Sequence, residues 1–227
     1  MTLPPDISSS PTAAPPGAGC SGSAAERSPA TAPAEIPPHM RGDRNQNPPG
    51  LGLWALWAED LRTHEGNFFE QGFWAVAVHR FGNWRMSIPT KLLRFPFSLL
   101  YRCLYKFVEW TCGISLPYTV KMGRRVHIWH HGGMILHAKS IGDEVHIRQN
   151  VTFGVARRDD NFALPSIAER VDIGCGACIL GDIQIGHDAV IGANAVVLKD
   201  VPPYAVAVGV PARIILRNAG VPPAPAA

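Results

Sequence analysis

The hydrophobic pattern repeats every six residues through the C-terminal half of the chain. Aliphatic residues open successive hexads at Ile173, Ile179, Ile185, Ile191 and Val197, and the position four further on is small or β-branched each time. An α-helix repeats about every 3.6 residues and a strand about every 2, so neither gives this register. The short strands of a three-sided coil do, because each coil stacks on the previous one. The pattern therefore predicts a triangular parallel β-helix.

The same register can be followed upstream in two displaced runs. The first starts at Leu116, the second starts at Ile135 with a displacement of one residue, and Ile167 rejoins the C-terminal series with a displacement of two more. A stack of coils tolerates such displacements if the extra residues leave it at a corner. We expect these insertions near residues 132–134 and within 154–166.

Composition divides the rest of the chain. Residues 1–50 are dominated by Pro, Ala, Ser and Gly, and such a segment cannot bury enough apolar surface to offset its ordering entropy, so we predict disorder there. A charged start followed by an apolar run is missing, so no secretory signal is expected and the cytoplasm is the expected location. We predict an α-helical region over 51–113, the β-helix over 114–217 and a flexible tail over 218–227.

The α-helical region contains three predicted helices. An amphipathic segment starts at Trp54, a second short helix covers residues 72–82, and a third runs from about Lys91 to Cys112, with Gly113 as its stop. Regularly spaced charges interrupt the third helix, so we predict a core or subunit-contact helix without stable membrane insertion. An interfacial helix remains an alternative. Its predicted apolar side consists of Phe97, Leu100, Leu104, Phe107, Val108 and Trp110.

Charge and cysteine content exclude several functions. The formal net charge of +3 is too small to indicate binding to nucleic acid. Cys175 and Cys178 form a C-x-x-C motif, which is typical of zinc or redox sites, but both lie inside one hexad and no second pair exists. We interpret them as ordinary corner residues.

Several stretches resemble the serine O-acetyltransferase family. They are HHGGMIL from His130, QNVTFG from Gln149, the two hexads from Ile173, the segment GANAVVLKDVPP from Gly192, and GVPAR from Gly209. The resemblance covers about residues 114–215 and implies an acetyl-CoA-dependent hexapeptide-repeat enzyme with a left-handed parallel β-helix. It also implies conversion of L-serine to O-acetylserine for cysteine biosynthesis, a homotrimer that could pair into a dimer of trimers, and no metal.

The implied chemistry requires a general base, because a hydroxyl is a poor nucleophile at its ordinary pKa. A neutral imidazole is well matched to that task near pH 7. The H-x-x-G spacing carries the family histidine onto His130, and a slip of one residue would give His131 instead. Gln149 and Glu169, like His130, stand two residues after a ladder residue, so we expect the three to stack on one corner, about 4.8 Å apart per coil. They would support catalysis there or form a solvated corner.

The other histidines of this region suit different roles. His127, His137 and His146 are expected at the surface or in subunit contacts. A related β-helix family holds zinc with three histidines at a subunit interface, and the histidines between 127 and 146 are numerous enough for such a site. The downstream ligand pair that this alternative needs is missing.

Three departures from the family pattern concern the acceptor. An aspartate that partners the family histidine falls on Ser115, the acidic residue before that histidine falls on Trp129, and a histidine that helps to hold serine falls on Leu164. The same pattern also resembles paralogues of exopolysaccharide synthesis, so a sugar hydroxyl is the alternative acceptor. A non-catalytic β-helix scaffold is the third hypothesis.

For acetyl-CoA, backbone groups would carry most of the recognition. Pantetheine amides can pair with the backbone of stacked turns where residues are small, and Gly154, Gly176 and Ala193 are the candidates. Lys199 and Arg213 are placed to meet the phosphates of coenzyme A. A plain corner position or a solvated cation is the alternative for each of these residues.

Overall fold

The structure of the protein is a computed structural model that describes residues 37–157 and 160–216. The chain divides into two units, Met1–Glu35 and Ile36–Ala227, and all described residues belong to the second. The predicted flexible tail 218–227 and the first 36 residues of the predicted disordered segment lie outside the described residues.

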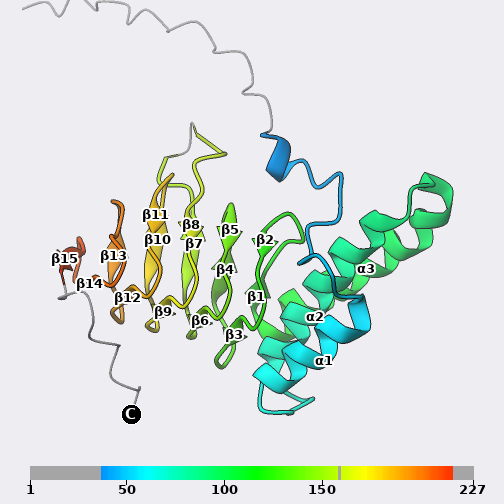
Figure 1. The fold of residues 1–227 in the computed structure, drawn as a ribbon, viewed down its shortest axis with the longest axis horizontal. Coiled ribbons are helices and arrows are strands. Elements are labelled where there is room, and N and C mark those ends of the chain that lie inside the picture. The colour runs from blue at the N-terminus through cyan, green and yellow to red at the C-terminus, as the bar shows by residue number, and fades with distance from the viewer. Residues whose placement is uncertain (1–36, 158–159, 217–227) are drawn as a thin grey trace, which may run out of the picture. The chain divides into compact units, whose positions relative to one another are not determined.

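The C-terminal part of the described chain forms three sheets, and consecutive strands of the chain join these sheets in rotation (Figure 1). Sheet A contains β1 (Ile114–Ser115), β4 (Met134–Leu136), β7 (Thr152–Gly154), β10 (Cys178–Leu180) and β13 (Val196–Val197). Sheet B contains β2 (Lys121–Met122), β5 (Ser140–Ile141), β8 (Ser166–Ile167) and β11 (Gln184–Ile185). Sheet C contains β3 (His127–Ile128), β6 (His146–Ile147), β9 (Asp172–Ile173), β12 (Val190–Ile191), β14 (Val206–Val208) and β15 (Arg213–Ile215).

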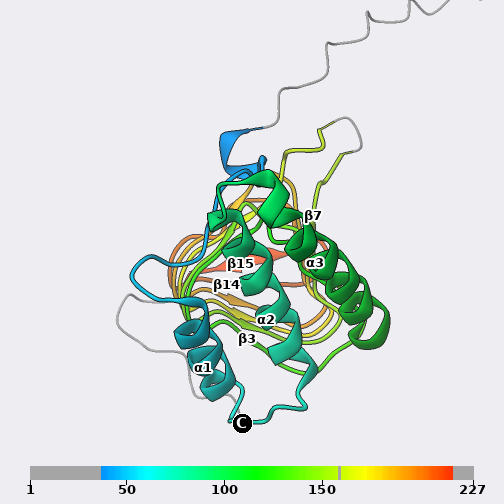
Figure 2. The ribbon, with the colours of Figure 1, turned by 90° about the vertical axis from the view of Figure 1, so that its right-hand side faces the viewer.

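The hexad residues form the interior of this stack. Ile128 pairs with Ile147, which pairs with Ile173, which pairs with Ile191, and all four side chains are buried. All strand pairs are parallel apart from β14 with β15, where the chain turns back at the end of the stack. Successive coils superpose when viewed along the stack (Figure 2). The prediction of mainly β structure with parallel sheets after a helical region is confirmed.

Corner conformations explain the small and polar residues between strands. Asn194 has a φ of +56° and Gly176 a φ of +70°, both in the left-handed region. A Cβ on Gly176 would lie 2.2 Å from Oδ1 of Asn194 in the next coil, so the stack itself requires a glycine here. The predicted insertions also leave at corners, since pairing continues on both sides of residues 129–133 and 155–165.

Three α-helices precede the coils. They are α1 (Leu53–Thr63), α2 (Gln71–Trp84) and α3 (Lys91–Cys112), and Gly113 ends α3 with a φ of +65°, as predicted. Short 3₁₀ helices cover Pro38–Met40 and Arg85–Ser87. Within the described residues, no helix is both long enough and apolar enough to cross a membrane.

The predicted apolar side of α3 is wrong in part. Val108 is buried and Phe97 and Leu104 pack against the core in part, as predicted, whereas Leu100, Phe107 and Trp110 are 48%, 62% and 82% exposed. Tyr101 and Cys112, which were not predicted, are also buried. The buried residues recur at intervals of seven and four, so they lie on one face of the helix, and α3 packs on α2 and β1. Several apolar side chains of α3 are exposed in the part of the chain that the structure describes, among them Leu92, Phe95 and Trp110.

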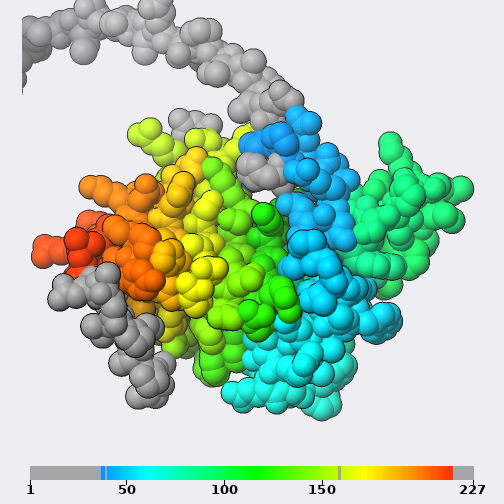
Figure 3. All heavy atoms as spheres, in the orientation of Figure 1, coloured from blue at the N-terminus to red at the C-terminus, as the bar shows by residue number. Residues whose placement is uncertain are grey.

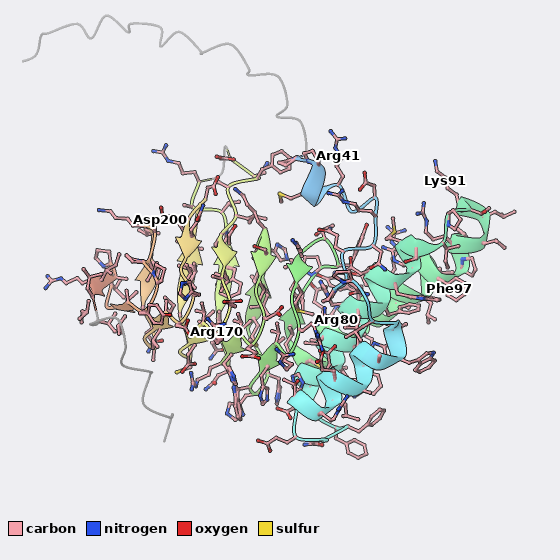
Figure 4. The ribbon with its side chains drawn as sticks, in the orientation of Figure 1. Arg41, Arg80, Lys91, Phe97, Arg170 and Asp200 are labelled. Atoms are coloured by element: carbon pink, nitrogen blue, oxygen red, sulfur yellow. The ribbon has the colours of Figure 1, made fainter. Side chains whose placement is uncertain are left out.

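Polar groups dock the helices on the first coil. The Arg80 guanidinium, fully buried, donates to Asp60 Oδ2 of α1 at 3.0 Å and to the carbonyl oxygen of Met122 at 3.1 Å. Nε2 of His79 donates to the carbonyl oxygen of Val120 at 2.9 Å, and the amide of Asn83 donates to that of Tyr118 at 2.8 Å. The labelled Arg80 lies where the helices meet the coils (Figure 4).

The end of the predicted disordered segment is also wrong. The described residues from Pro37 onward run along the helices and the first coils (Figure 3). The side chain of Asn47 donates to the carbonyl oxygen of Arg80 at 2.9 Å, and the Gln46 amide N–H donates to Oδ1 of Asn83 at 3.1 Å. Tertiary hydrogen bonds thus order residues whose composition alone predicts disorder.

Candidate active site

One corner of the stack brings most of the predicted site residues together. In each coil this corner joins sheet C to sheet A, and it consists of residues 129–133, 148–151, 174–177 and 192–195; we call it the His130 corner. Gly176 N–H donates to the Gln149 carbonyl oxygen at 2.9 Å, and Asn194 N–H donates to that of Cys175 at 2.8 Å. His130, Gln149, Gly176 and Ala193 therefore lie in successive coils of one corner.

His130 is presented to solvent at the edge of this corner. Its φ of +63° is in the left-handed region, and both His130 and His131 are exposed. Within the described residues, neither side chain forms a hydrogen bond. The extra residue of this corner makes it wider than the corners above it, and Gly132 and Gly133 absorb the change with φ values of +95° and +63°.

Glu169 does not belong to the His130 corner, and the predicted three-residue stack is wrong. Residues 155–165 lengthen a single corner, so Ile167 pairs with Ile141 in sheet B and Glu169 falls on the corner between sheets B and C. There it pairs with Arg170 at 2.8 Å. Figure 4 shows Arg170 and Asp200 on different edges of the stack. The residue that stacks above Gln149 is Cys175.

The remaining cofactor candidates flank sheet A or close its end. Gly154 is the last residue of β7, and Lys199 is an exposed residue that follows β13. Arg213 begins β15 and is exposed; the N–H of its neighbour Ala212 donates to the Val196 carbonyl oxygen of β13 at 2.8 Å. The candidates other than Glu169 thus border sheet A or its C-terminal end.

A pocket of about 690 Å³ lies over the outer face of sheet A. Its floor includes Ile135, Thr152 and Gly154, and Leu164 of the long corner contributes to its wall. Met40 of the N-terminal segment also lines it. A Cβ on Gly154 would meet only Leu180 Cδ2, at 3.9 Å, so packing within the chain does not require a glycine there. The space beside Gly154 is open to a ligand.

A short hydrogen-bonded chain beside this pocket was not predicted from the sequence. The Tyr105 hydroxyl of α3 lies 2.9 Å from Ser115 Oγ, which lies 3.2 Å from Nε2 of His137. His137 lines the pocket and is half-buried, and this burial lowers its pKa. The available signal was the serine at a position where the family has an aspartate. In the structure, Ser115 forms its hydrogen bond with His137 and not with His130.

His127 is wrongly predicted as a surface residue. It is 4% exposed and stacks on Trp129 with ring centroids 3.9 Å apart. Its ring lies 4.7 Å from that of His64, the C-cap residue of α1. Burial, and secondarily the neighbouring His64 and His146, lowers the pKa of His127 to about 4. Helices α1 and α2 pack on this end of the stack, which is why the histidine is covered. Trp129 Nε1 donates to Nδ1 of His146 at 3.0 Å.

In residues 37–157 and 160–216, no group of three or more His, Cys, Asp or Glu side chains is arranged to hold a metal ion. Cys175 and Cys178 are free thiols. Cys175 lies in the corner, as predicted, whereas Cys178 is the first residue of β10, so the corner prediction is wrong for Cys178.

Comparisons with known proteins relate this chain to others. No protein-family model matches it. The serine acetyltransferase of Mycobacterium tuberculosis is 38% identical over 149 residues, which cover 65% of this chain and 62% of that protein. The serine acetyltransferase of Escherichia coli K12 is 36% identical over 146 residues, which cover 64% of this chain and 51% of that protein. The chain thus spans about half to three-fifths of the length of these curated relatives.

Solved structures agree with the sequence relatives. The soybean serine acetyltransferase superposes with a TM-score of 0.60 and 30% identity, both as apoenzyme and complexed with serine. Each alignment covers 72% of this chain and 69% of the soybean chain. At this degree of identity and coverage, the chain belongs to the serine acetyltransferase family.

Proposed function

We propose that this chain is an acetyl-CoA-dependent O-acetyltransferase that transfers the acetyl group to L-serine, with His130 as general base. The observation that carries the proposal is the His130 corner, where His130, Gln149, Gly176 and Ala193 share one edge of sheet A in a chain of the serine acetyltransferase family. Serine is named as the bound molecule of one soybean relative. Cysteine biosynthesis is the metabolic role that this activity would serve.

The reaction follows from the chemistry of the two substrates. The acceptor oxygen attacks the thioester carbonyl carbon while an imidazole nitrogen of His130 takes the hydroxyl proton. Backbone N–H groups at the corner stabilise the tetrahedral oxyanion. The C–S bond then breaks, and the leaving thiolate recovers the proton, which gives the acetyl ester and free coenzyme A. Gln149 is proposed to support the imidazole, and His131 is the rival base.

For acetyl-CoA we propose a path along sheet A. Gly154 supports this path because its missing Cβ leaves room for the pantetheine arm without any demand from internal packing. Gly176 and Ala193 would flank the arm at the corner, although the stack already explains Gly176. Lys199 and Arg213, both exposed, would meet the phosphates.

A second acceptor class is favoured by the pocket over sheet A. A serine zwitterion needs charged partners, yet none of the described residues that line this pocket is Asp, Glu, Lys or Arg. Leu164, which lines this pocket, replaces a polar residue of the family pattern. An uncharged sugar hydroxyl is therefore the second candidate acceptor, and a scaffold without activity is the outcome that would refute both.

We propose a left-handed β-helix over 114–217, preceded by an α-helical domain over 51–113, in a cytoplasmic homotrimer that could pair into a dimer of trimers. The exposed apolar side chains of α3, with Leu92 81% exposed and Trp110 82% exposed, support a subunit contact. Exposed Ile135 and Leu198 beside sheet A support another.

Release of free coenzyme A from acetyl-CoA, followed with a thiol reagent, tests the function. We expect release that depends on L-serine, or on a glycan for the second candidate. His130→Ala should lower kcat by about 10²–10⁴-fold, the usual contribution of general-base catalysis. His131→Ala is the matched control and should retain most activity. No release with any acceptor, or an unchanged rate in His130→Ala, would refute the proposal.

The cofactor path has its own test. Gly154→Ala adds a methyl group to open space, so the free energy of unfolding should stay unchanged while KM for acetyl-CoA rises. Gly176→Ala should instead destabilise the fold, because its Cβ collides with Asn194. An unchanged KM in a folded Gly154→Ala protein would remove this part of the proposal.

A further inference from the structure

The hydrogen-bonded chain of Tyr105, Ser115 and His137 joins three separate elements at one pocket. Tyr105 comes from α3, Ser115 from β1, and His137 follows β4 directly. The oxygen–oxygen distance is 2.9 Å and the oxygen–nitrogen distance is 3.2 Å. An imidazole oriented by a second group, which a third group orients in turn, is the arrangement that active sites use to fix a ring. Nothing in the proposed reaction at His130 uses it.

The direction of the hydrogen bonds follows from the acidity of the groups. A phenol is a stronger acid than an aliphatic hydroxyl and hence the better donor, and burial raises the pKa of Tyr105, so it keeps its proton. Tyr105 therefore donates to Ser115 Oγ, and the Ser115 hydroxyl donates to Nε2 of His137. A neutral ring that accepts at Nε2 carries its proton on Nδ1. Among the described residues, Nδ1 has no hydrogen-bond partner.

The pocket that His137 lines has a definite polarity. Most of its wall is apolar, and the polar side chains among its described residues are those of Thr119, His137, Thr152 and Asn161. A charged group would lose its hydration there without gaining a counter-charge. A hydroxyl-bearing, uncharged end of a molecule fits instead, and charged groups of the same molecule would remain outside.

We infer that this pocket holds the hydroxyl-bearing end of the acceptor, and that Nδ1 of His137 donates a hydrogen bond to one of its oxygens. Ser115 and Tyr105 are positioning residues that fix the ring. The inference rests on the proposed O-acetyl transfer and leaves proton transfer with His130. No described residue of the His130 corner lines the pocket, so the oxygen that His137 holds is not the one that is acetylated. The inference therefore applies to an acceptor with a second hydroxyl, such as a sugar, and not to L-serine.

Steady-state kinetics on the full chain test this assignment. His137→Gln keeps a polar group near Ser115 but offers no donor at Nδ1. We expect kcat/KM for the acceptor to fall about tenfold, which corresponds to one lost hydrogen bond, with KM for acetyl-CoA unchanged. Tyr105→Phe should give a smaller loss of the same pattern, about threefold. His187→Gln, on a different corner of the stack, is the matched control and should behave like wild type.

A second measurement does not depend on turnover. In ¹⁵N spectra of histidine-labelled protein, with His137→Gln as the assignment reference, His137 should carry its proton on Nδ1. Added methyl glycoside should shift that signal, and L-serine is the comparison that should not. A proton on Nε2, no shift with methyl glycoside, or an equal loss for acceptor and acetyl-CoA would overturn the inference. If wild type releases no coenzyme A, the proposed function fails, and the spectra still decide whether His137 binds a hydroxyl compound.

Discussion

The stack of coils and the helical region pack on each other but are stabilised in different ways. In the coils, one kind of contact recurs: Ile147 lies between Ile128 and Ile173, and the same arrangement continues to Ile191. In the helical region, single polar contacts do the corresponding work. Arg80, for example, joins Asp60 of α1 to a carbonyl oxygen of the first coil.

The two regions should differ in how much stability a single substitution removes. A repeated aliphatic contact contributes in proportion to the surface it buries, so a smaller side chain loses only part of it. A buried ion pair behaves otherwise, because removal of one partner leaves the other without compensation in a medium of low dielectric constant. The helical region should therefore be the more sensitive of the two to single substitutions.

The largest effect should follow from Arg80→Met. The variant leaves the fully buried carboxyl of Asp60 without its partner, and we expect the free energy of unfolding in urea to fall by about 3–5 kcal/mol. Burial already raises the pKa of Asp60, so the deficit should shrink at low pH as this carboxyl takes up a proton.

The double variant Arg80→Met with Asp60→Leu is the control for this prediction. With both polar groups replaced by apolar ones of similar size, much of the stability should return. A single variant as stable as wild type would show that the pair is not buried in solution.

Ile147→Ala tests the other side of the comparison. Its side chain is 0% exposed, and the cavity should lower the free energy of unfolding by about 2–5 kcal/mol. Ile147→Val is the graded control, at about 0.5–1.5 kcal/mol. A loss that grows with the volume removed at Ile147, beside a full loss in Arg80→Met, would support the contrast. An Arg80→Met loss no larger than that of Ile147→Val would contradict it.

The same contrast explains what the sequence predicts. The interior of the coils was predictable because every hexad repeats one physical requirement, an aliphatic side chain in a narrow core. The end of α3 was predictable because Gly113 adopts a left-handed conformation that few other residues adopt. Periodicity also located both insertions.

The sequence did not predict the position of a residue where that position depends on one tertiary contact or on the length of one insertion. Glu169 was placed on the wrong corner because the length of an insertion does not show whether its residues form further strands or lengthen a single corner. His127 was expected at the surface because nothing in the sequence says that α1 and α2 cover it. The Ser115–His137 contact joins residues 22 apart, and neither belongs to a motif. Contacts of this kind exist only after the chain has folded.

Acid should weaken the contact between helices and coils. Burial lowers the pKa of His79 to about 3 and that of His127 to about 4, so both are neutral in the folded protein. The unfolded chain binds protons near pH 6.5, so stability is complete above that value and is lost as pH falls towards 4. From pH 7 to 5, we expect a loss of about 1–2 kcal/mol for each histidine.

Urea unfolding at several pH values, with His127→Gln as the comparison, measures this effect. The variant should show a shallower dependence on pH than wild type, because one of the two depressed groups is gone. Equal slopes in both proteins would contradict the buried position of His127.

The smallest effect should come from Glu59→Gln at the solvent-exposed edge of the same contact. Glu59 of α1 meets Arg124 at 2.6 Å and Arg125 at 3.4 Å, and Arg124 chiefly lowers the pKa of this carboxyl. The two arginines are 39% and 40% exposed, so water and salt screen the attraction, and we expect a loss of about 0.2–1 kcal/mol. Unfolding measured at low and high salt should show the loss vanish at high salt, which the Arg80→Met deficit should not do. A salt-independent loss as large as that of Arg80→Met would mean that burial does not distinguish the two ion pairs. The buried ion pair of Arg80 and the exposed ion pair of Glu59 would then stabilise the contact with the first coil in the same way.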